Sequence, residues 1–379
     1  MTKIILALFT VSLFWCSCRS TRQNQKKGDG PHLKFLSQYI VPYNYQFQNT
    51  TVGGLSGIDY DPKKNEYYFI SDDRSDKNPA RFYEARILIS KDKIDTVIFG
   101  NTLFLKDQNG NLYPNSRQDP FHTPDPEALR LDPVNHTFIW SSEGERIVTP
   151  QKTILENPAV TLTDSNGNYI DTFILPPQLK MTALPYGPRQ NGVFEGLTYS
   201  DKYKSLLVSV EEPLLQDGPR AGTGDSSGII RMIRFDMATK KPVAEYAYKI
   251  DPVAHPPLRA GGFKINGIPD ILSYGTHELL VLERSFSSGD LSCTIKVYLA
   301  DLSGADNVLS LNSLKGNTAI KIIPKKLLLN MDSLGIYIDN IEGVTFGPTL
   351  ADGKRSLLFI ADNNFNPLEK TQLLLFEIR

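Results

Sequence analysis

Hydrophobic and polar residues alternate in short runs along most of the chain, and one pattern of two runs joined by a turn recurs. The clearest copy is Asn191–Pro213. Glu195-Gly196 opens the apolar segment Leu197–Tyr199, a polar turn follows, and Leu206–Val210 leads to a second acidic pair that begins at Glu211. A period of two predicts β-strands, and two strands joined by a short turn predict an antiparallel hairpin. Glu195 and Glu211 should therefore be neighbours at one end of that hairpin.

The same unit occurs five times at an even spacing, which is typical of a repeat architecture. Each copy begins at a residue that we call the opener, and successive openers are 68 to 75 residues apart: Ser56, Glu127, Glu195, Asp270 and Glu342. Each second strand ends at an acidic residue that we call the closer: Asp72, Glu143, Glu211, Glu283 and Asp362. The closer follows its opener by 16 residues in the first three copies, by 13 in the fourth and by 20 in the fifth.

Third and fourth strands are predicted after each hairpin of the first four copies. They are Arg81–Ile89 and Asp95–Phe99, Ala159–Thr163 and Tyr169–Leu175, Ile229–Phe235 and Val243–Ile250, and Thr294–Leu299 and Ile320–Ile323. The fifth copy has a third strand, Gln372–Ile378, but no fourth, whereas Leu33–Pro42 stands alone before the first hairpin. Pairing these two segments would close a ring and remove an exposed sheet edge.

The sequence therefore predicts an all-β fold, a β-propeller of five four-stranded blades closed by residues 33–42. Six blades are the alternative if a degenerate copy lies in the long connections. No long segment shows the 3.6-residue period of a helix. The propeller domain is expected to span residues 31–379.

The amino-terminal residues have the features of an export signal. Met1–Ser17 has Lys3 near its start and then an apolar run too short to span a bilayer. Cys18 follows Ser17, which is the acceptor pattern of a bacterial lipoprotein, and residues 18–30 are expected to form a flexible tether. An ordinary cleaved secretory signal is the alternative. We expect an exported cell-envelope lipoprotein, on the periplasmic side or surface of a membrane and held there by lipid at Cys18 alone.

Composition and charge narrow the range of partners. The formal net charge is −1, from 41 basic and 42 acidic residues, so nothing predicts binding to nucleic acid. With Cys18 lipidated, the mature chain would retain only Cys293 as a thiol, which we expect to be a small buried hydrophobe. We expect a monomer that binds a small anionic or ester substrate.

Candidate chemistry lies at the openers and closers, because the first strand of each propeller blade lines the central channel. Their side chains should converge on one rim of that channel. The candidate metal ligands are Asp72, Glu127, Glu143, Glu195, Glu211, Asp270, Glu283, Glu342 and Asp362. Ca²⁺ is the expected cofactor, because it takes many oxygen ligands and no histidine or cysteine clusters with these acids. The alternative is that the acids only accept backbone N–H bonds in turns.

Two arginines directly follow predicted closing segments. Arg74 lies just beyond Asp72-Asp73, and Arg284 follows Glu283. A guanidinium at such a rim is suited to an anionic group such as phosphate. Both are therefore candidate substrate-binding residues, and no catalytic residue is assigned.

These segments resemble the phytase-like family described as having esterase-like activity of phytase. The resemblance is carried by GGLSGIDYD with FISDDR, DPEALRLD with SSEGE, FEGLTYS with LLVSVEEP, and NIEGVTFGP with LFIADNN, and it covers about Leu33 to Arg379. It implies a propeller-like fold and, by analogy with propeller phytases, Ca²⁺-dependent hydrolysis of phosphate esters by carboxylates on the rim. Asp270-Ile271 and Ser56 depart from the Glu-Gly pattern.

The resulting hypothesis is an exported, metal-dependent hydrolase of phosphate esters or other esters. A hydrolase similar to sugar lactonases is one alternative. The other is a non-catalytic propeller that binds a ligand or a protein.

Overall fold

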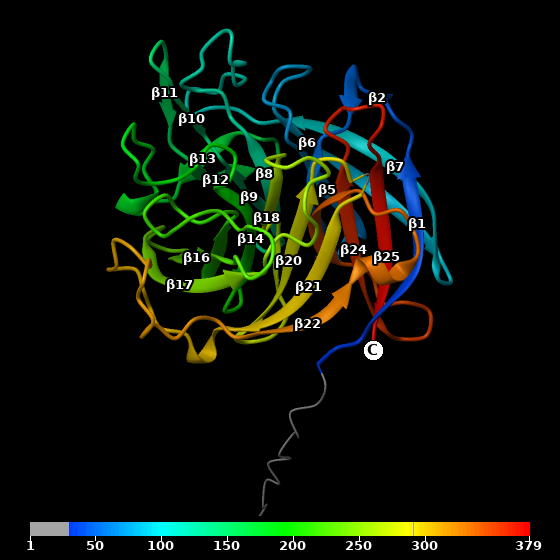
Figure 1. The fold of residues 1–379 in the computed structure, drawn as a ribbon. Coiled ribbons are helices and arrows are strands. Elements are labelled where there is room, and N and C mark those ends of the chain that lie inside the picture. Colours follow the sequence, from blue (N-terminus) through cyan, green and yellow to red (C-terminus); the bar gives the residue numbers. More distant parts are fainter. Residues whose placement is uncertain (1–29, 291) are drawn as a thin grey trace, which may run out of the picture. The chain divides into compact units, whose positions relative to one another are not determined.

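Five antiparallel sheets follow one another along the chain of the computed structural model, which describes residues 30–290 and 292–379. The innermost strands of successive sheets pack against one another in a closed circle, in the order β4, β8, β14, β19, β23 and back to β4. The sheets are thus the blades of a five-bladed β-propeller, and the predicted fold is confirmed (Figure 1).

The first three blades each contain four strands, which follow one another from the channel to the outside of the propeller. Blade 1 consists of β4 (Leu55–Asp61), β5 (Glu66–Ser71), β6 (Arg81–Ser90) and β7 (Lys93–Phe104). Blade 2 consists of β8 (Pro126–Asp132), β9 (Thr137–Ser142), β12 (Ala159–Asp164) and β13 (Tyr169–Thr172). Blade 3 consists of β14 (Phe194–Ser200), β15 (Ser205–Val210), β16 (Gly228–Asp236) and β17 (Pro242–Ile250).

Blades 4 and 5 differ from this plan in where their strands come from. Blade 4 consists of β18 (Lys264–Gly267), β19 (Ile271–Ser273), β20 (Glu278–Ser287), β21 (Thr294–Asp301) and β22 (Lys325–Asn330). Blade 5 consists of β23 (Asn340–Phe346), β24 (Arg355–Asp362), β25 (Thr371–Ile378) and β1 (Leu33–Val41). The amino-terminal strand therefore completes the last blade.

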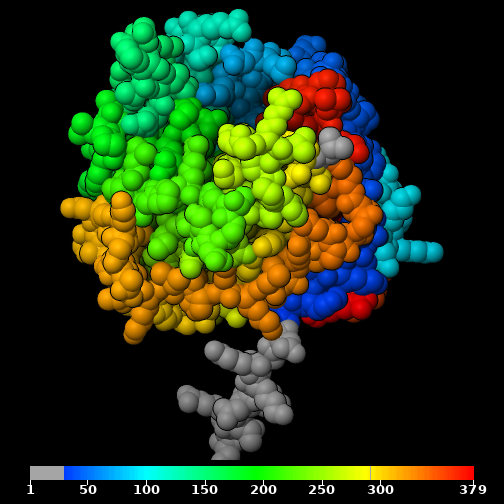
Figure 2. All heavy atoms as spheres, in the orientation of Figure 1, coloured from blue at the N-terminus to red at the C-terminus, as the bar shows by residue number. Residues whose placement is uncertain are grey.

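Pairing of β1 with β25 closes the ring as predicted. The two strands are antiparallel, from Leu33 opposite Ile378 to Val41 opposite Thr371. The blue amino-terminal and red carboxy-terminal segments lie side by side (Figures 1 and 2). Every residue of β25 is buried, so without β1 this strand would present an unpaired edge to water.

Five hydrophobic clusters fill the spaces between neighbouring blades. In β24, for example, Leu357 and Phe359 pack toward blade 4, whereas Leu358 and Ile360 pack toward blade 1. Successive side chains of a strand point to opposite faces, and here both faces are covered. This is why the second strands are continuous apolar runs.

Blade 4 corrects two details of the prediction. Its inner strand is split into β18 and β19, which both pair with β20. Its fourth strand is β22, whereas the predicted segment Ile320–Ile323 is irregular. Ile320 and Ile322 instead pack on a small cluster around Ala247. Apolar side chains in a covering loop produced a pattern like that of a strand.

Elements outside the blades are few. Two hairpins, β2 (Tyr45–Phe47) with β3 (Thr50–Val52) and β10 (Glu145–Val148) with β11 (Thr153–Glu156), were not predicted. The only helices among the described residues are three 3₁₀ turns: η1 (Pro177–Leu179), η2 (Leu302–Gly304) and η3 (Met331–Leu334). None of these is long or apolar enough to cross a membrane. The predicted signal peptide, Cys18 and most of the tether lie in residues 1–29, outside the described residues.

Removing β1 should destabilise the propeller strongly. A chain that begins at Tyr43 loses the partner of β25 and two buried side chains, Leu33 and Val41. Burial of each such side chain contributes about 1.5–3 kcal/mol, so the unfolding free energy should fall by at least about 3 kcal/mol. Urea unfolding against a control chain that begins at Pro31 measures this difference. Equal midpoints for the two chains would show that closure by β1 does not hold the ring.

Candidate metal site at the channel rim

A cavity of about 900 Å³ lies at the end of the channel where inner strands begin and second strands end. Six of the nine predicted metal ligands line it: Asp72, Glu127, Glu143, Glu195, Glu211 and Glu342. Four further acids that were not predicted also line it: Asp125, Asp290, Asp339 and Glu369. Glu195 and Glu211 are neighbours as expected, since a carboxylate oxygen of each lies within 4.8 Å of the other.

A β-bulge positions the opener in four of the five blades. The register of the inner hairpin shifts between Leu55 and Gly57, and equivalent shifts occur at Glu127, Glu195 and Glu342. A bulge leaves one residue out of the ladder and turns its side chain away from the normal alternation. The bulges thereby direct the opener side chains toward the rim.

Glycine after the opener allows neighbouring inner strands to approach closely. A Cβ on Gly196 would lie 2.6 Å from the Cα of Asp270, and a Cβ on Gly343 would lie 3.1 Å from the Cα of Gly57. Contacts below 3.0 Å are not tolerated by real side chains. The Glu-Gly step is therefore a packing requirement of the narrow channel, and it also brings acids from adjacent blades together.

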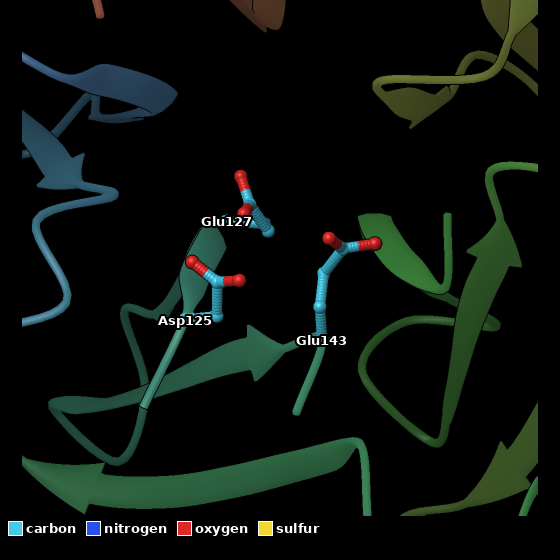
Figure 3. Close-up of side chains that lie close together, drawn as sticks. All are labelled: Asp125, Glu127 and Glu143. Carbon is cyan, nitrogen blue, oxygen red and sulfur yellow. The ribbon is translucent and has the colours of Figure 1, made fainter. Parts of the chain in front are cut away.

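Two groups of three carboxylates form within the cavity and share one residue. In the first group, one oxygen from each of Asp125, Glu127 and Glu143 lies within 4.8 Å of the others. The three side chains lie close together in Figure 3. In the second group, the same spacing joins Glu143 to Glu195 and Glu211. Glu143 therefore stands between two adjacent clusters, which we call the carboxylate trios.

Burial raises the pKa values of these acids because it penalises their charged forms. The pKa of Glu127, Glu143 and Glu195 each lies well above its ordinary value, first through desolvation and then through repulsion by neighbouring carboxylates. The pKa of Asp125 rises to about 6, since desolvation outweighs the attraction of Arg74. The trios thus hold negative charge at a cost that a bound cation would offset.

A second acidic group lies where blades 1 and 5 meet. Desolvation and the nearby Asp362 and Glu342 hold the pKa of Asp72 well above its ordinary value. Desolvation raises the pKa of Glu342 to about 7, although Arg284 opposes the shift. One carboxylate oxygen of Asp362, Oδ2, is buried without a hydrogen-bond partner. Asp362 does not line the cavity, but repulsion from its carboxylate helps to raise the pKa of Asp72.

Both predicted anion-binding arginines line the cavity, where they contact carboxylates of the protein itself. Arg74 donates to Glu145 at 2.5 Å and lies 3.6 Å from Asp125. Arg284 donates to Glu211 at 2.7 Å and to Glu342 at 2.8 Å. Their main effect in this structure is to compensate acids, and their binding of an anionic ligand stays a prediction.

The prediction placed Glu283 at the rim, and the structure places it elsewhere. Glu283 accepts hydrogen bonds from the Tyr248 hydroxyl at 2.9 Å and the Asp251 amide at 2.8 Å, and it pairs with Lys325. Adjacent residues of β20 face opposite ways, so Arg284 occupies the rim position and Glu283 faces blade 3. The short spacing of 13 residues in this copy was the signal of a changed register.

Asp270 also lies away from the rim cavity, which corrects its placement. Both of its oxygens accept from Arg130, at 2.7 and 2.8 Å, and Oδ2 also accepts from the Val344 amide at 2.8 Å. Arg130 donates to the Ile58 carbonyl at 2.8 Å as well. This ion pair is fully buried and cross-links the inner strands.

Sequence reasoning missed Asp125 and Arg130. Asp125 precedes Glu127 by two residues in the run Asp125-Pro126-Glu127, so a strand period would place both on one side. That was an available signal. Arg130 sits inside a buried strand, and nothing in the local sequence indicates its partner, 140 residues away.

Sequence comparison identifies the family. The family model described as "Phytase-like: Esterase-like activity of phytase" matches residues 50–365. The chain belongs to the phytase-like family. Membership of this family fits a hydrolase. The comparison with curated proteins gives no match.

Several solved structures are similar to this phytase-like chain at low identity. The endo-arabinase of Bacteroides thetaiotaomicron VPI-5482 is 15% identical, covers 85% of this chain and 93% of its own, and has a TM-score of 0.43. The α-L-arabinofuranosidase of Lactobacillus brevis is 10% identical, with coverages of 86% and 91% and a TM-score of 0.47. A gluconolactonase of Xanthomonas campestris is 10% identical, with coverages of 92% and 90% and a TM-score of 0.33. We draw no chemistry from similarities at this level.

Neutralising Asp270 should destabilise this phytase-like protein without affecting a metal site. Asp270→Asn removes the only carboxylate that directly pairs with Arg130 among the described residues and leaves only the electrostatic attraction of Asp59, so the unfolding free energy should fall by about 3–5 kcal/mol. Urea unfolding measures the loss, and the rise in melting temperature on adding Ca²⁺ should remain as in the wild type. A folded Asp270→Asn variant that no longer responds to Ca²⁺ would return Asp270 to the set of ligands.

Stability in the presence of a chelator should fall as pH rises. The pKa of Glu342 rises from 4.5 to about 7 on folding and that of Asp125 from 3.8 to about 6, so the folded chain binds more protons between these values. The unfolding free energy therefore decreases from about pH 4.5 to about pH 7. Thermal unfolding between pH 5 and pH 8 tests this. A melting temperature that rises across this window would contradict the raised pKa values of Glu342 and Asp125.

Proposed function

We propose that this phytase-like protein is a hydrolase of esters that depends on a divalent cation, with Ca²⁺ as the metal. The observation that carries the proposal is the pair of carboxylate trios that share Glu143. The family's description supports ester hydrolysis, and the cavity supplies the acids that such a metal needs. The proposal includes export and anchoring at Cys18, which follow from the amino-terminal sequence alone.

The residues present fit a hard divalent cation. Ca²⁺ binds oxygens at about 2.3–2.6 Å, so any two of its ligands lie within about 5 Å of each other. The oxygens within each trio meet this limit, since they lie within 4.8 Å. Gln190 and Asn191 line the same cavity and offer neutral amide oxygens. Asp125, Glu127, Glu143, Glu195 and Glu211 would hold the metal.

The same donor set disfavours softer metals such as zinc. Among the described residues that line the cavity there is no histidine, and the one thiol is Cys293. Burial raises the pKa of Cys293 to about 12, and the side chain is mostly enclosed, as expected for a buried hydrophobe. A site built from carboxylates and amides suits Ca²⁺, Mg²⁺ or Mn²⁺.

When bound, a divalent cation supplies Lewis-acid activation of the ester and of the attacking water. Glu342 is suited to accept the proton from that water, because it lines the cavity, lies outside both trios and has a pKa of about 7. Arg284 at 2.8 Å and the Asn340 side-chain amide at 2.9 Å fix its orientation. A carboxyl group with this pKa exchanges a proton readily near neutral pH.

Loss of the shared carboxylate should abolish most of the response to calcium. Ca²⁺ at 100 times its dissociation constant stabilises the native state by about 2.7 kcal/mol, which corresponds to a rise in melting temperature of roughly 5 °C. In Glu143→Gln we expect less than half of this rise, because one acid is lost from both trios. The matched control is Asp92→Asn, which removes an exposed acid from the turn between β6 and β7.

Thermal melts with and without chelator are the first measurement, and turnover of esters under the same conditions is the second. Chelator should abolish turnover, and added Ca²⁺ should restore it. A wild-type response to Ca²⁺ in Glu143→Gln would contradict the site. A calcium response without turnover of phosphate esters, carboxylic esters or lactones would favour a non-catalytic binding propeller.

A further inference from the structure

The rim cavity has many more acidic than basic groups in its lining, and its basic groups are already paired. Ten carboxyl groups and three guanidinium groups line it, an excess of seven, and no lysine is among the described lining residues. Arg74 and Arg284 already contact two carboxylates each, and Arg220 lies 2.8 Å from Glu212. Each of these guanidinium groups is thus already engaged with an acid of the protein, and none offers unpaired positive charge to an incoming anion.

One side of the cavity is apolar. We call Phe263, Ile265 and Phe286 the apolar wall: Phe263 directly precedes β18, Ile265 lies in β18, and Phe286 faces Ile265 from β20. The ring centroids of Phe263 and Phe286 are 6.4 Å apart. Phe263 is 55% exposed, and Leu368, which also lines the cavity, is 83% exposed. Large apolar side chains gathered at the opening of a cavity favour an apolar ligand.

We propose that the cavity takes uncharged carboxylic esters or lactones that carry an apolar group, and that it discriminates against multiply charged phosphate esters. This inference rests on the proposed hydrolase function and names its substrate class. In the reaction, the oxygen of water bonds to the acyl carbon while the acyl–oxygen bond breaks. One proton of the water passes to the leaving oxygen, which yields a carboxylic acid and an alcohol.

Each part of the cavity has a distinct role in this selection. The apolar wall removes the apolar group of the substrate from water, which stabilises the bound state without requiring charge. The surplus carboxylates repel an incoming dianion, and the paired arginines have no unused charge with which to offset that repulsion. A neutral ester avoids the repulsion, and its carbonyl oxygen would still be free to meet a cation that the trios would hold.

Two substrates with one leaving group test the proposal, and the salt dependence of their ratio isolates the charge selection, because carboxylic esters are intrinsically more reactive than phosphate monoesters. With the full mature chain in Ca²⁺, kcat/KM for 4-nitrophenyl butyrate should exceed that for 4-nitrophenyl phosphate by at least about tenfold. Raising ionic strength should narrow the ratio, since salt screens the repulsion of the dianion but leaves the neutral ester unaffected. Inositol hexakisphosphate should be the poorest substrate.

Two variants test the apolar wall and the charge separately. Phe263→Ala should raise KM for the butyrate ester about fivefold and leave kcat unchanged, because it removes binding area away from the carboxylates. Leu258→Ala is the control, because Leu258 is 82% exposed and does not line the cavity. Asp290→Lys reverses one charge in the lining outside the trios, and it should raise kcat/KM several-fold for the phosphate ester only.

The outcomes separate this inference from the function on which it rests. Faster hydrolysis of the phosphate esters than of the butyrate ester would overturn the proposed substrate class but would not contradict the proposed hydrolase function. Absence of turnover on all three substrates, with calcium binding intact, would overturn both. An unchanged KM in Phe263→Ala would remove the apolar wall from substrate binding.

Discussion

One buried guanidinium, that of Arg130, joins the inner strands of four blades. It donates to carbonyl groups of Ile58 in β4, Leu129 in β8, Ile271 in β19 and Val344 in β23, and it pairs with Asp270. A narrow channel leaves these backbone groups without water, so they need a partner inside the protein. A planar group with five donors is suited to several strands at once. The position of the rim depends on these contacts between Arg130 and the inner strands.

The close packing that Arg130 stabilises also concentrates acids at the rim. Glycines after the openers let the inner strands approach, and the bulges direct Glu127, Glu195 and Glu342 toward one another. Burial and mutual repulsion then raise their pKa values, which opposes folding near neutral pH. Arg74 and Arg284 compensate only part of this charge. Binding of a cation would compensate much of the rest. The repulsion that lowers stability without a cation would therefore contribute to the affinity for a metal.

The fold could be predicted because each blade is covered on both faces. Continuous apolar second strands, turns at regular intervals and an unpaired terminal strand suffice to specify five blades and their closure. The candidate site was only partly predictable, because a bulge changes which residue faces the channel. In blade 4 the inner strand is interrupted at Asp270, and the Asp270 carboxylate contacts Arg130. Because adjacent residues of β20 face opposite ways, Arg284 lies at the rim and Glu283 does not. Such shifts depend on tertiary packing, and local alternation does not reveal them.

The central claim is that Glu143 lies between two groups of ligands for a divalent cation. Diffraction from crystals soaked in Mn²⁺ tests it most directly, because Mn²⁺ prefers the same oxygen ligands and its anomalous signal locates it. The account predicts at least one anomalous peak at coordination distance from a carboxylate oxygen of Glu143, with further ligands from Asp125 and Glu127 or from Glu195 and Glu211. A cavity that stays free of anomalous signal at saturating Mn²⁺, or a peak bound only by acids outside the trios, would contradict the account.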